Sequence, residues 1–368
     1  MTADVIAYAP STPRKLDRHR DAAASRLGLP RARARRVLAA SLAGQAQWPA
    51  SVVLGHNMPQ LVPLVDTDHH VAVLYAHNEL LRTYSAREAG RVLDAAGVIV
   101  CVSNYVADKT AERLPPRLRD RVAVVHNAVD TTVFRPAGTR SPDGALHVVF
   151  VGRMLPDKGP DVLVEALVRL AREDIFATFV GTTNFAPRAA LTSFERGMRL
   201  AGEPLGDRAH WLPFQPRDKV AAIMRTADVV VVPSRWAEPF ALTVLEGMAS
   251  GAAVIASRVG GIPEAAGRAG ILVSPDDPEA LAQALEGLAD DSRGLARVRT
   301  ASLLHARAND WSTARTRLDQ VLADRCLTTG ALRAHDGTRG STATAQPGPT
   351  TRSQSRPISR PVGTENTS

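Results

Sequence analysis

The feature that most constrains this chain is a regular alternation of short apolar runs with longer amphipathic stretches. The runs are nearly continuous in apolar residues, which is typical of strands buried on both faces of a parallel sheet. The runs predicted as strands are SVVLG (51–55), VAVLYA (71–76), VIVCVS (98–103), VAVVH (122–126), HVVFVG (147–152), FATFVG (176–181), HWLPF (210–214), DVVVVP (228–233), AAVIAS (252–257) and GILVS (270–274).

The stretches between the later runs have the spacing of amphipathic helices. They include PDVLVEALVRLARE (160–173), RDKVAAIMRTA (217–227) and PEALAQALEGLAD (278–290). Strands that alternate strictly with helices predict parallel sheets with right-handed crossover connections. The predicted fold class is therefore α/β, with doubly wound, Rossmann-like sheets.

One segment interrupts this alternation and divides the chain. RPAGTRSPDGA (135–145) has the Pro, Gly and charge content of a linker. We therefore expect two Rossmann-like domains facing across a cleft, an amino-terminal one over 1–136 and a carboxy-terminal one over 137–327. Residues 328–368 are expected to form a disordered tail, because a Ser-, Thr-, Pro- and Arg-rich segment buries too little apolar surface to offset its chain entropy.

Charge and composition exclude several classes of protein. The formal net charge of +8 comes from the two ends of the chain, so it does not indicate a nucleic-acid groove. The basic run PRARARR (30–36) is interpreted as a solvated helix entry, with contact to phosphates or to an acidic membrane surface as the alternative. No apolar run approaches the ~18 residues of a membrane span, and we see no signal peptide. Two distant cysteines fit a reducing cytoplasm, where we expect the protein to be.

Two cations follow one of the predicted strands. Arg153 and Lys158 lie in VFVGRMLPDKG (149–159), which has the order of a strand, a glycine turn and a helix start. Cations beside a helix amino terminus can bind a diphosphate through charge-assisted bonds and free N–H groups. The alternative is a surface turn with two solvated cations. The segment has neither a Walker GK[ST] nor a G-x-G-x-x-G sequence, so dinucleotide binding is only weakly indicated.

Two carboxylates follow another predicted strand. Glu238 and Glu246 lie in RWAEPFALTVLEGMASG (235–251), the first outside and the second inside a helix expected to begin near Ala241. Eight residues of helix span ~12 Å, which is the reach from the ribose of a sugar nucleotide to its sugar. The pair could hold the two ends of such a molecule while the two cations hold its diphosphate. The alternative is two ordinary solvated acids at a helix entry.

One signal competes with this interpretation. DTDHH (66–70) contains a D-x-D sequence and two histidines, and in one class of sugar transferases a D-x-D sequence holds a metal that bridges donor phosphates. Here it precedes a strand and lacks that context. We interpret it as a loop and predict no metal site.

These segments together resemble a known enzyme family. GR-x4-KG (152–159), PS-x3-EPF-x5-E (233–246) and ASG-x-AVIAS-x-VGGIPE (249–264) resemble the retaining glycosyltransferases of family 4, as does VVHNAVDTTVF (124–134). The resemblance covers residues from about 51 to 322 and implies the GT-B fold, in which two Rossmann-like domains face each other.

The resemblance also implies roles for the charged residues. Arg153 and Lys158, next to Gly152, would neutralise the donor diphosphate. Glu238 would hold the donor sugar near its reacting carbon, and Glu246 would bind the ribose.

Further roles follow from the same resemblance. The backbone at Phe240, Ala241 and Leu242 would meet the phosphates and the sugar, and Phe214 and Gln215 would lie near the base. In the amino-terminal half, LYAHN (74–78) resembles the family segment whose histidine reaches the donor sugar. This assigns His77 to catalysis together with Glu238, Arg153 and Lys158. The alternative for His77 is a structural histidine at a strand end, and His56 in LGHNMP is a weaker candidate.

The sequence departs from the family pattern in three places. Ala241 stands where glycine is usual, and a β-carbon there could restrict the backbone approach to the phosphates. Ala128 replaces a glycine in the NGVD-like signature. Nothing matches the glycine-rich loop with which the family usually opens, so we interpret ADVIAYAPS as the second strand and expect the amino-terminal domain to lack its first βα unit. Either the start of the chain lies too far downstream, or the first βα unit is replaced.

The expected function is transfer of a sugar from a nucleotide-diphosphate sugar, UDP-linked first and GDP-linked second, to an acceptor hydroxyl with retention. The donor is a co-substrate, and no cofactor is required. The acceptor is expected to be a small molecule such as an antibiotic, or an envelope glycolipid, with at most peripheral membrane contact and no nucleic acid. The alternatives are a GT-B epimerase or phosphorylase, and a catalytically impaired partner protein that binds sugar nucleotides.

Overall fold

The computed structural model describes residues 19–21, 23, 31–136, 144–183 and 190–326. The strand expected at ADVIAYAPS, most of the predicted linker and the predicted tail lie outside these described residues. The two sheets of the described chain belong to one compact unit.

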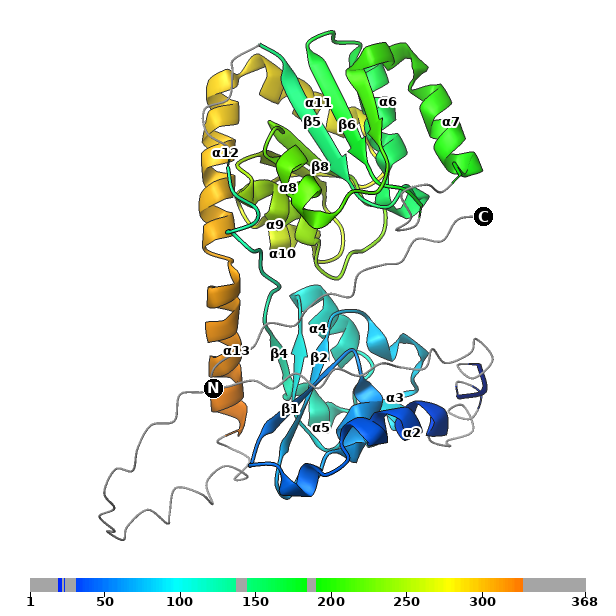
Figure 1. The fold of residues 1–368 in the computed structure, drawn as a ribbon, viewed down its shortest axis with the longest axis vertical. Helices are drawn as coiled ribbons and strands as arrows, with labels where there is room; N and C mark the ends of the chain where they lie inside the picture. Colours follow the sequence, from blue (N-terminus) through cyan, green and yellow to red (C-terminus); the bar gives the residue numbers. More distant parts are fainter. Residues whose placement is uncertain (1–18, 22, 24–30, 137–143, 184–189, 327–368) are drawn as a thin grey trace, which may run out of the picture. The chain divides into compact units, whose positions relative to one another are not determined.

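The carboxy-terminal sheet, of which β5, β6 and β8 are labelled in Figure 1, has six parallel strands in the order β10-β9-β8-β5-β6-β7. This is the strand order of a doubly wound Rossmann sheet. Its strands are β5 (Leu146–Val151), β6 (Ile175–Val180), β7 (Ala209–Leu212), β8 (Val229–Val232), β9 (Ala253–Ser257) and β10 (Ile271–Val273).

The amino-terminal sheet has four parallel strands in the order β1-β2-β3-β4. They are β1 (Val52–His56), β2 (Val71–Ala76), β3 (Ala96–Cys101) and β4 (Val122–Val124). Each of the ten apolar runs predicted as strands overlaps one strand of these two sheets, with ends that differ by at most two residues, and the predicted α/β class is confirmed.

Helices cover both faces of the carboxy-terminal sheet, which explains why its strands are continuously apolar. Val148, Val229 and Ile255 belong to one buried cluster with side chains of α6 and α11. Their strand neighbours Val149 and Val230 belong to a second cluster, with side chains of α9. The helices associated with this sheet are η4 (Pro156–Lys158), α6 (Pro160–Leu170), α7 (Ser193–Ala201), η5 (Glu203–Arg208), α8 (Arg217–Met224), α9 (Leu242–Ala249), α10 (Ile262–Ala266), α11 (Pro278–Asp290) and α12 (Ser292–Arg307).

The last described helix returns to the amino-terminal sheet. α13 (Trp311–Cys326) contacts β3, and Val129 forms an isolated bridge with Asp310 just before the helix. The other elements of this region are α2 (Ala32–Ser41), η1 (Gln45–Gln47), η2 (Pro59–Leu64), η3 (Leu80–Thr83), α3 (Ala86–Val92), α4 (Asn104–Ala111) and α5 (Pro116–Arg119). Among the described helices, none is long and apolar enough to cross a bilayer.

The predicted helices form with small differences at their ends. The prediction for 278–290 matches α11, and α9 begins at Leu242 with Ala241 as its N-cap. α6 ends at Leu170, before the predicted end, because Ala171 adopts a left-handed conformation with φ 50°.

The basic run PRARARR opens α2, but its Arg31 is not solvated as predicted. The Arg31 guanidinium donates to Glu88 at 2.9 Å and lies 4.0 Å from the centroid of the Tyr84 ring. This pairing fastens the start of α2 to α3, because Glu88 lies in the first turn of that helix.

Gly181, directly after β6, permits a close contact that no other residue allows. Its φ is +141°, and a β-carbon there would lie 1.9 Å from the carbonyl oxygen of Gly152 at the end of β5. We expect Gly181→Ala to lower the free energy of unfolding by at least about 2 kcal/mol, measured by urea denaturation. Gly287→Ala is the matched control, because Gly287 lies inside α11 with open space around it. That variant should gain about 0.5–1 kcal/mol, and similar losses in both variants would contradict the argument.

Candidate active site

The candidate site lies where the order of the carboxy-terminal sheet reverses. From β5 the chain proceeds outward to β7 on one side, and from β8 it proceeds outward to β10 on the other. β5 and β8 are therefore adjacent, although the chain continues from them toward opposite sides of the sheet. Such a switch point is where open α/β sheets bind ligands, beyond the carboxyl ends of the strands. The loop after β5 carries Gly152, Arg153 and Lys158, and the loop after β8 carries Glu238.

These two loops are joined through their backbones. The carbonyl oxygen of Asp157 accepts hydrogen bonds from the N–H groups of Arg235 and Trp236, at 3.0 and 3.1 Å. Gly159 has φ +68°, and a β-carbon on it would lie 2.0 Å from the carbonyl oxygen of Pro233. The glycine of the predicted cation loop therefore allows the two loops to approach each other closely.

Lys158 and Glu238, predicted from separate motifs, meet in an ion pair. The Lys158 ammonium donates to Oε1 of Glu238, and the Ser234 hydroxyl donates to the same oxygen at 2.9 Å. Glu238 is only 8% exposed, so a partner is needed to offset the desolvation of its charge. The Lys158 ammonium also lies 5.6 Å from the centroid of the Trp236 ring. The arrangement places one ammonium group directly beside a nearly buried carboxylate.

Arg153 is placed differently from Lys158. Its side chain is exposed, and it forms no hydrogen bond or ion pair with the part of the chain that the structure describes. The structure thus puts Arg153 on the same strand-end loop as Lys158 without bringing the two cations to a shared partner.

Arg235 is a site residue that the sequence interpretation missed. It donates two hydrogen bonds to the Asp161 carboxylate, at 2.7 and 2.9 Å, and one to Asp276 at 2.6 Å. Asp161 lies in the first turn of α6 and Asp276 follows β10, so one guanidinium ties the loops after three strands together. Arg235 and Ser234 both lie inside PS-x3-EPF, so the motif itself was the signal that could have indicated them.

The start of α9 offers free backbone donors. Its N-cap, Ala241, has no side chain that could accept from the first N–H groups. Ala241 has φ −79° and ψ 98°, a conformation open to any L-residue, so the change from glycine strains nothing in this backbone. Phe240 is buried, whereas Leu242 is 37% exposed.

Glu246 lies further along α9, with its side chain 16% exposed. Burial raises the pKa of its carboxyl group, and the charge of Arg217, whose guanidinium lies 3.4 Å away, offsets part of that effect. Arg217 begins α8, and it follows the segment after β7 that carries Phe214 and Gln215. The amide of Gln215 donates to the carbonyl of Pro213 at 3.3 Å. The structure thus links the predicted ribose residue, through Arg217, to the loop predicted to lie near the base.

The two histidine candidates of the amino-terminal half form a pair. His56 ends β1 and His77 follows β2, and their Nδ1 and Nε2 atoms are 2.9 Å apart. Both rings stack on Tyr75, with centroids 5.0 and 4.7 Å away. Burial lowers the pKa of each imidazole, and His56 lowers that of His77 further. This favours a neutral pair in which one ring donates and the other accepts.

The competing D-x-D segment has structural partners. DTDHH lies in a turn, where the Asp68 N–H donates to the Asp66 carboxylate at 3.2 Å. The ring nitrogens of His69 and His70 lie 2.8 and 2.9 Å from the carbonyl oxygens of Trp48 and Gln45. No group of three or more potential metal ligands occurs among the described residues.

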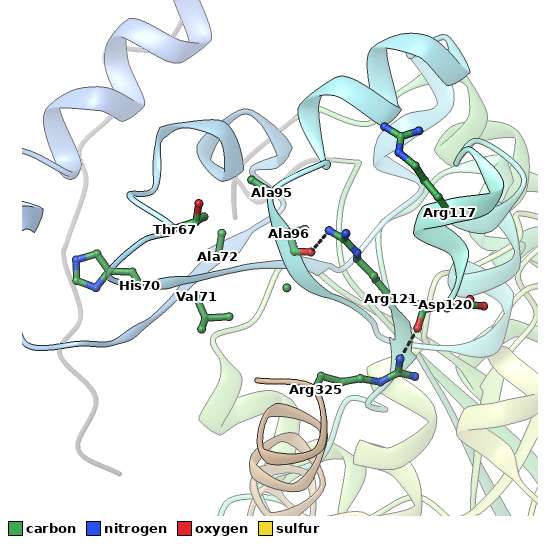
Figure 2. Close-up of a pocket in the computed structure, with 11 residues that line it drawn as sticks. Thr67, His70, Val71, Ala72, Ala95, Ala96, Arg117, Asp120, Arg121 and Arg325 are labelled. Atoms are coloured by element: carbon green, nitrogen blue, oxygen red, sulfur yellow. Dashed lines mark hydrogen bonds between the residues drawn. The ribbon is translucent and has the colours of Figure 1, made fainter. Parts of the chain in front are cut away.

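A cavity of about 360 Å³ lies at the amino ends of β2 and β3, whereas His56 and His77 lie at the carboxyl ends of β1 and β2 (Figure 2). Figure 2 shows the Arg121 guanidinium directed at the carbonyl of Ala96, a contact of 2.7 Å, and Arg325 directed at the carbonyl of Asp120. These arginines bind backbone oxygens there, and none of the predicted site residues lines this cavity.

Two family models and several known proteins match this chain. Residues 145–291 match the family model described as "Glycosyl transferases group 1", and residues 2–133 match the one described as "Glycosyltransferase Family 4". The D-inositol 3-phosphate glycosyltransferase of Streptomyces avermitilis is 31% identical over 313 residues, which cover 80% of this chain and 64% of that protein. The enzyme of the same name from Corynebacterium glutamicum (strain R) is 31% identical over 287 residues, covering 72% and 67%. The chain thus spans slightly less than two thirds of the first of these relatives.

Solved structures show the same fold. Anabaena HepE in complex with UDP and glucose has a TM-score of 0.63 and 18% identity, over 78% of this chain and 81% of that one. The sucrose-phosphate synthase of Thermosynechococcus elongatus has a TM-score of 0.59 and 20% identity, over 82% and 81%. These likenesses show a GT-B fold of two Rossmann-like domains.

The buried position of Glu246 should make stability depend on pH. Its pKa is raised in the folded state, so folding favours the protonated carboxyl group. The protonated group therefore contributes fully to the free energy of unfolding below the pKa of the unfolded chain, and this contribution is lost as the pH rises through the pKa of the folded state. We expect Glu246→Gln to be more stable than the wild type at pH 7, with the gain vanishing near about pH 4. The measurement is urea denaturation without ligand.

Glu165→Gln is the matched control for Glu246→Gln, because Glu165 is exposed on α6 and pairs with Arg169. It should show no such gain. A gain at pH 4 as large as at pH 7, or none at either pH, would contradict the argument.

Proposed function

The chain belongs to glycosyltransferase family 4, and from that premise we propose that it transfers a sugar from a nucleotide-diphosphate sugar to an acceptor hydroxyl. The observation that carries this proposal is the meeting of Lys158 and Glu238 at the switch point between β5 and β8. The donor is placed on residues 137–327 and the acceptor side on residues 1–136.

The donor diphosphate is placed between the two strand-end loops. Lys158 can exchange its bond to Glu238 for a phosphate oxygen, because an ammonium on a flexible stem turns easily. Exposed Arg153 adds a second cation, and the uncapped N–H groups at the start of α9 add a third source of positive charge. With these groups on the diphosphate, the proposal requires no metal ion or other cofactor.

The two ends of the donor are assigned to the two acids. Glu246 has only 16% of its side chain exposed and lies beside Arg217, and ribose hydroxyls would give its oxygens further donors. Glu238 would hold the sugar and would lose Lys158 when the diphosphate binds. The loop with Phe214 and Gln215 would meet the base. The complexes of Anabaena HepE with UDP and UDP-glucose support UDP as the nucleotide to test first.

The proposed chemistry exchanges one bond for another at the anomeric carbon. The bond from this carbon to the leaving phosphate oxygen breaks, and a bond to the acceptor oxygen forms on the same face, which retains configuration. The acceptor proton passes to the leaving phosphate oxygen. Arg153, Lys158 and the helix terminus stabilise the negative charge that develops there. His77, held by His56, is assigned to the donor sugar from the amino-terminal domain.

The names of the relatives suggest an acceptor class. Several curated relatives near 30% identity are named D-inositol 3-phosphate glycosyltransferase, so a phosphorylated polyol is the first acceptor class to test. A small specialised metabolite and an envelope glycolipid are the next two.

A nucleotide-sugar screen tests the donor. Thermal shift is measured with UDP, GDP and their sugars, and the melting temperature should rise with the logarithm of ligand concentration above the Kd. Transfer to D-inositol 3-phosphate and to water is then measured with each donor that binds. Donor binding without any turnover would favour the alternative of a non-catalytic sugar-nucleotide-binding protein.

Variants test the site. Glu238→Gln and Lys158→Met should each lower kcat at least about a hundredfold, because each removes a charge from the reacting centre. Glu165→Gln, in the exposed pair with Arg169, should leave kcat unchanged. If both site variants kept wild-type turnover, the site assignment would be wrong.

A further inference from the structure

The loop that carries Glu238 is also contacted by the amino-terminal sheet. Ser103, directly before α4, is the N-cap of this helix and is fully buried. Its hydroxyl accepts from the Val106 N–H at 3.1 Å and donates to the carbonyl oxygen of Pro239 at 2.6 Å. Pro239 is the residue after Glu238, so the α4 terminus holds the peptide next to the predicted catalytic acid.

A second contact joins the same two regions. Glu264, in the first turn of α10, accepts from the N–H groups of Asn104 and Tyr105 at 2.6 and 2.9 Å. It also accepts from the side chains of Asn104 at 2.7 Å and His126 at 3.0 Å. Burial alone would raise the pKa of Glu264, but these hydrogen bonds lower it to about 2. Glu264 is therefore an ionised cap on a helix of the other sheet at all ordinary pH values.

Two glycines directly before α10 contact the backbone of Glu238 and Pro239. The Gly261 N–H donates to the carbonyl oxygen of Glu238 at 2.7 Å. A β-carbon on Gly261 would lie 2.2 Å from the carbonyl oxygen of Pro239, and one on Gly260 would lie 2.5 Å from that of Glu238. The Glu238–Pro239 peptide is thus held between the glycines before α10 on one side and Ser103 on the other. Glu264, three residues after Gly261, fastens α10 to α4.

We propose that Ser103 and Glu264 are positioning residues that orient the Glu238 carboxylate. Glu238 is then correctly placed only while the start of α4 contacts the loop that carries Glu238. The inference rests on the proposed function, since it gives the amino-terminal domain a part in aligning the donor-sugar acid. Neither residue touches the reacting atoms. Their effect passes through the carbonyl groups of Glu238 and Pro239, and a small error in the position of a catalytic group costs a large factor in rate.

Three single variants test this role. Ser103→Ala and the nearly isosteric Glu264→Gln should each lower kcat about tenfold, while the Kd for UDP stays unchanged because Glu246 and its neighbours are intact. The matched control is Ser85→Ala, because Ser85 is the N-cap of α3 and accepts from Glu88 N–H at 3.1 Å. It loses the same kind of cap and should lower the melting temperature without lowering kcat.

A second measurement does not depend on activity. The Gly261 amide, which donates to Glu238, should exchange its hydrogen at least about tenfold faster in Ser103→Ala and Glu264→Gln, and at the wild-type rate in Ser85→Ala.

Unchanged Gly261 exchange in both variants, wild-type kcat in both, or an equal kcat loss in Ser85→Ala would each overturn the inference. A wild-type protein that binds UDP and no donor sugar, or that transfers from none, would instead count against the proposed function. The exchange measurement would then still decide whether Ser103 and Glu264 position Glu238.

Discussion

The adjacency of β5 and β8 is the constraint on which the site depends. Because the two strands are neighbours and the chain departs from them in opposite directions, their loops emerge side by side without being contiguous in sequence. One loop supplies Lys158 and the other supplies Glu238, and the ion pair between them is a direct product of the strand order. The glycine at 159 lets the loops approach, and Arg235 with its carboxylates prevents them from separating.

The charged side chains at the carboxyl ends of these strands differ in how easily a ligand could replace their partners. Glu238 is paired with a flexible ammonium rather than with a rigid guanidinium, whereas Arg235 nearby is held by two carboxylates. Partial burial of Glu246 raises its pKa, and the charge of Arg217 offsets part of that effect. Groups that are fully satisfied hold the loops, and groups with replaceable partners lie where the donor is proposed to bind.

The amino-terminal sheet also contacts the candidate site. Its strand ends supply the His56–His77 pair, and its helix α4 seats on the segment that carries Glu238. A contact of this kind would link the placement of Glu238, the acid proposed to hold the donor sugar, to the contact between the two sheets. Glycines occur at 260 and 261 because the backbone there approaches the Glu238–Pro239 peptide too closely for a β-carbon.

Sequence alone determined the ten strands, the α/β class and the motifs that carry the charged residues, because apolar periodicity, glycine turns and helix starts are set by neighbours along the chain. The sequence could not reveal that Lys158 pairs with Glu238, or that Arg235 connects the loops after three strands through Asp161 and Asp276. Nor could it reveal that Ala241 has a backbone conformation that any L-residue can adopt. Ser103 lies 136 residues from Pro239, and Glu264 lies 160 residues from Asn104. Only the tertiary structure decided these contacts, because a hydrogen bond between distant segments depends on strand order and helix placement, and residue spacing does not encode either.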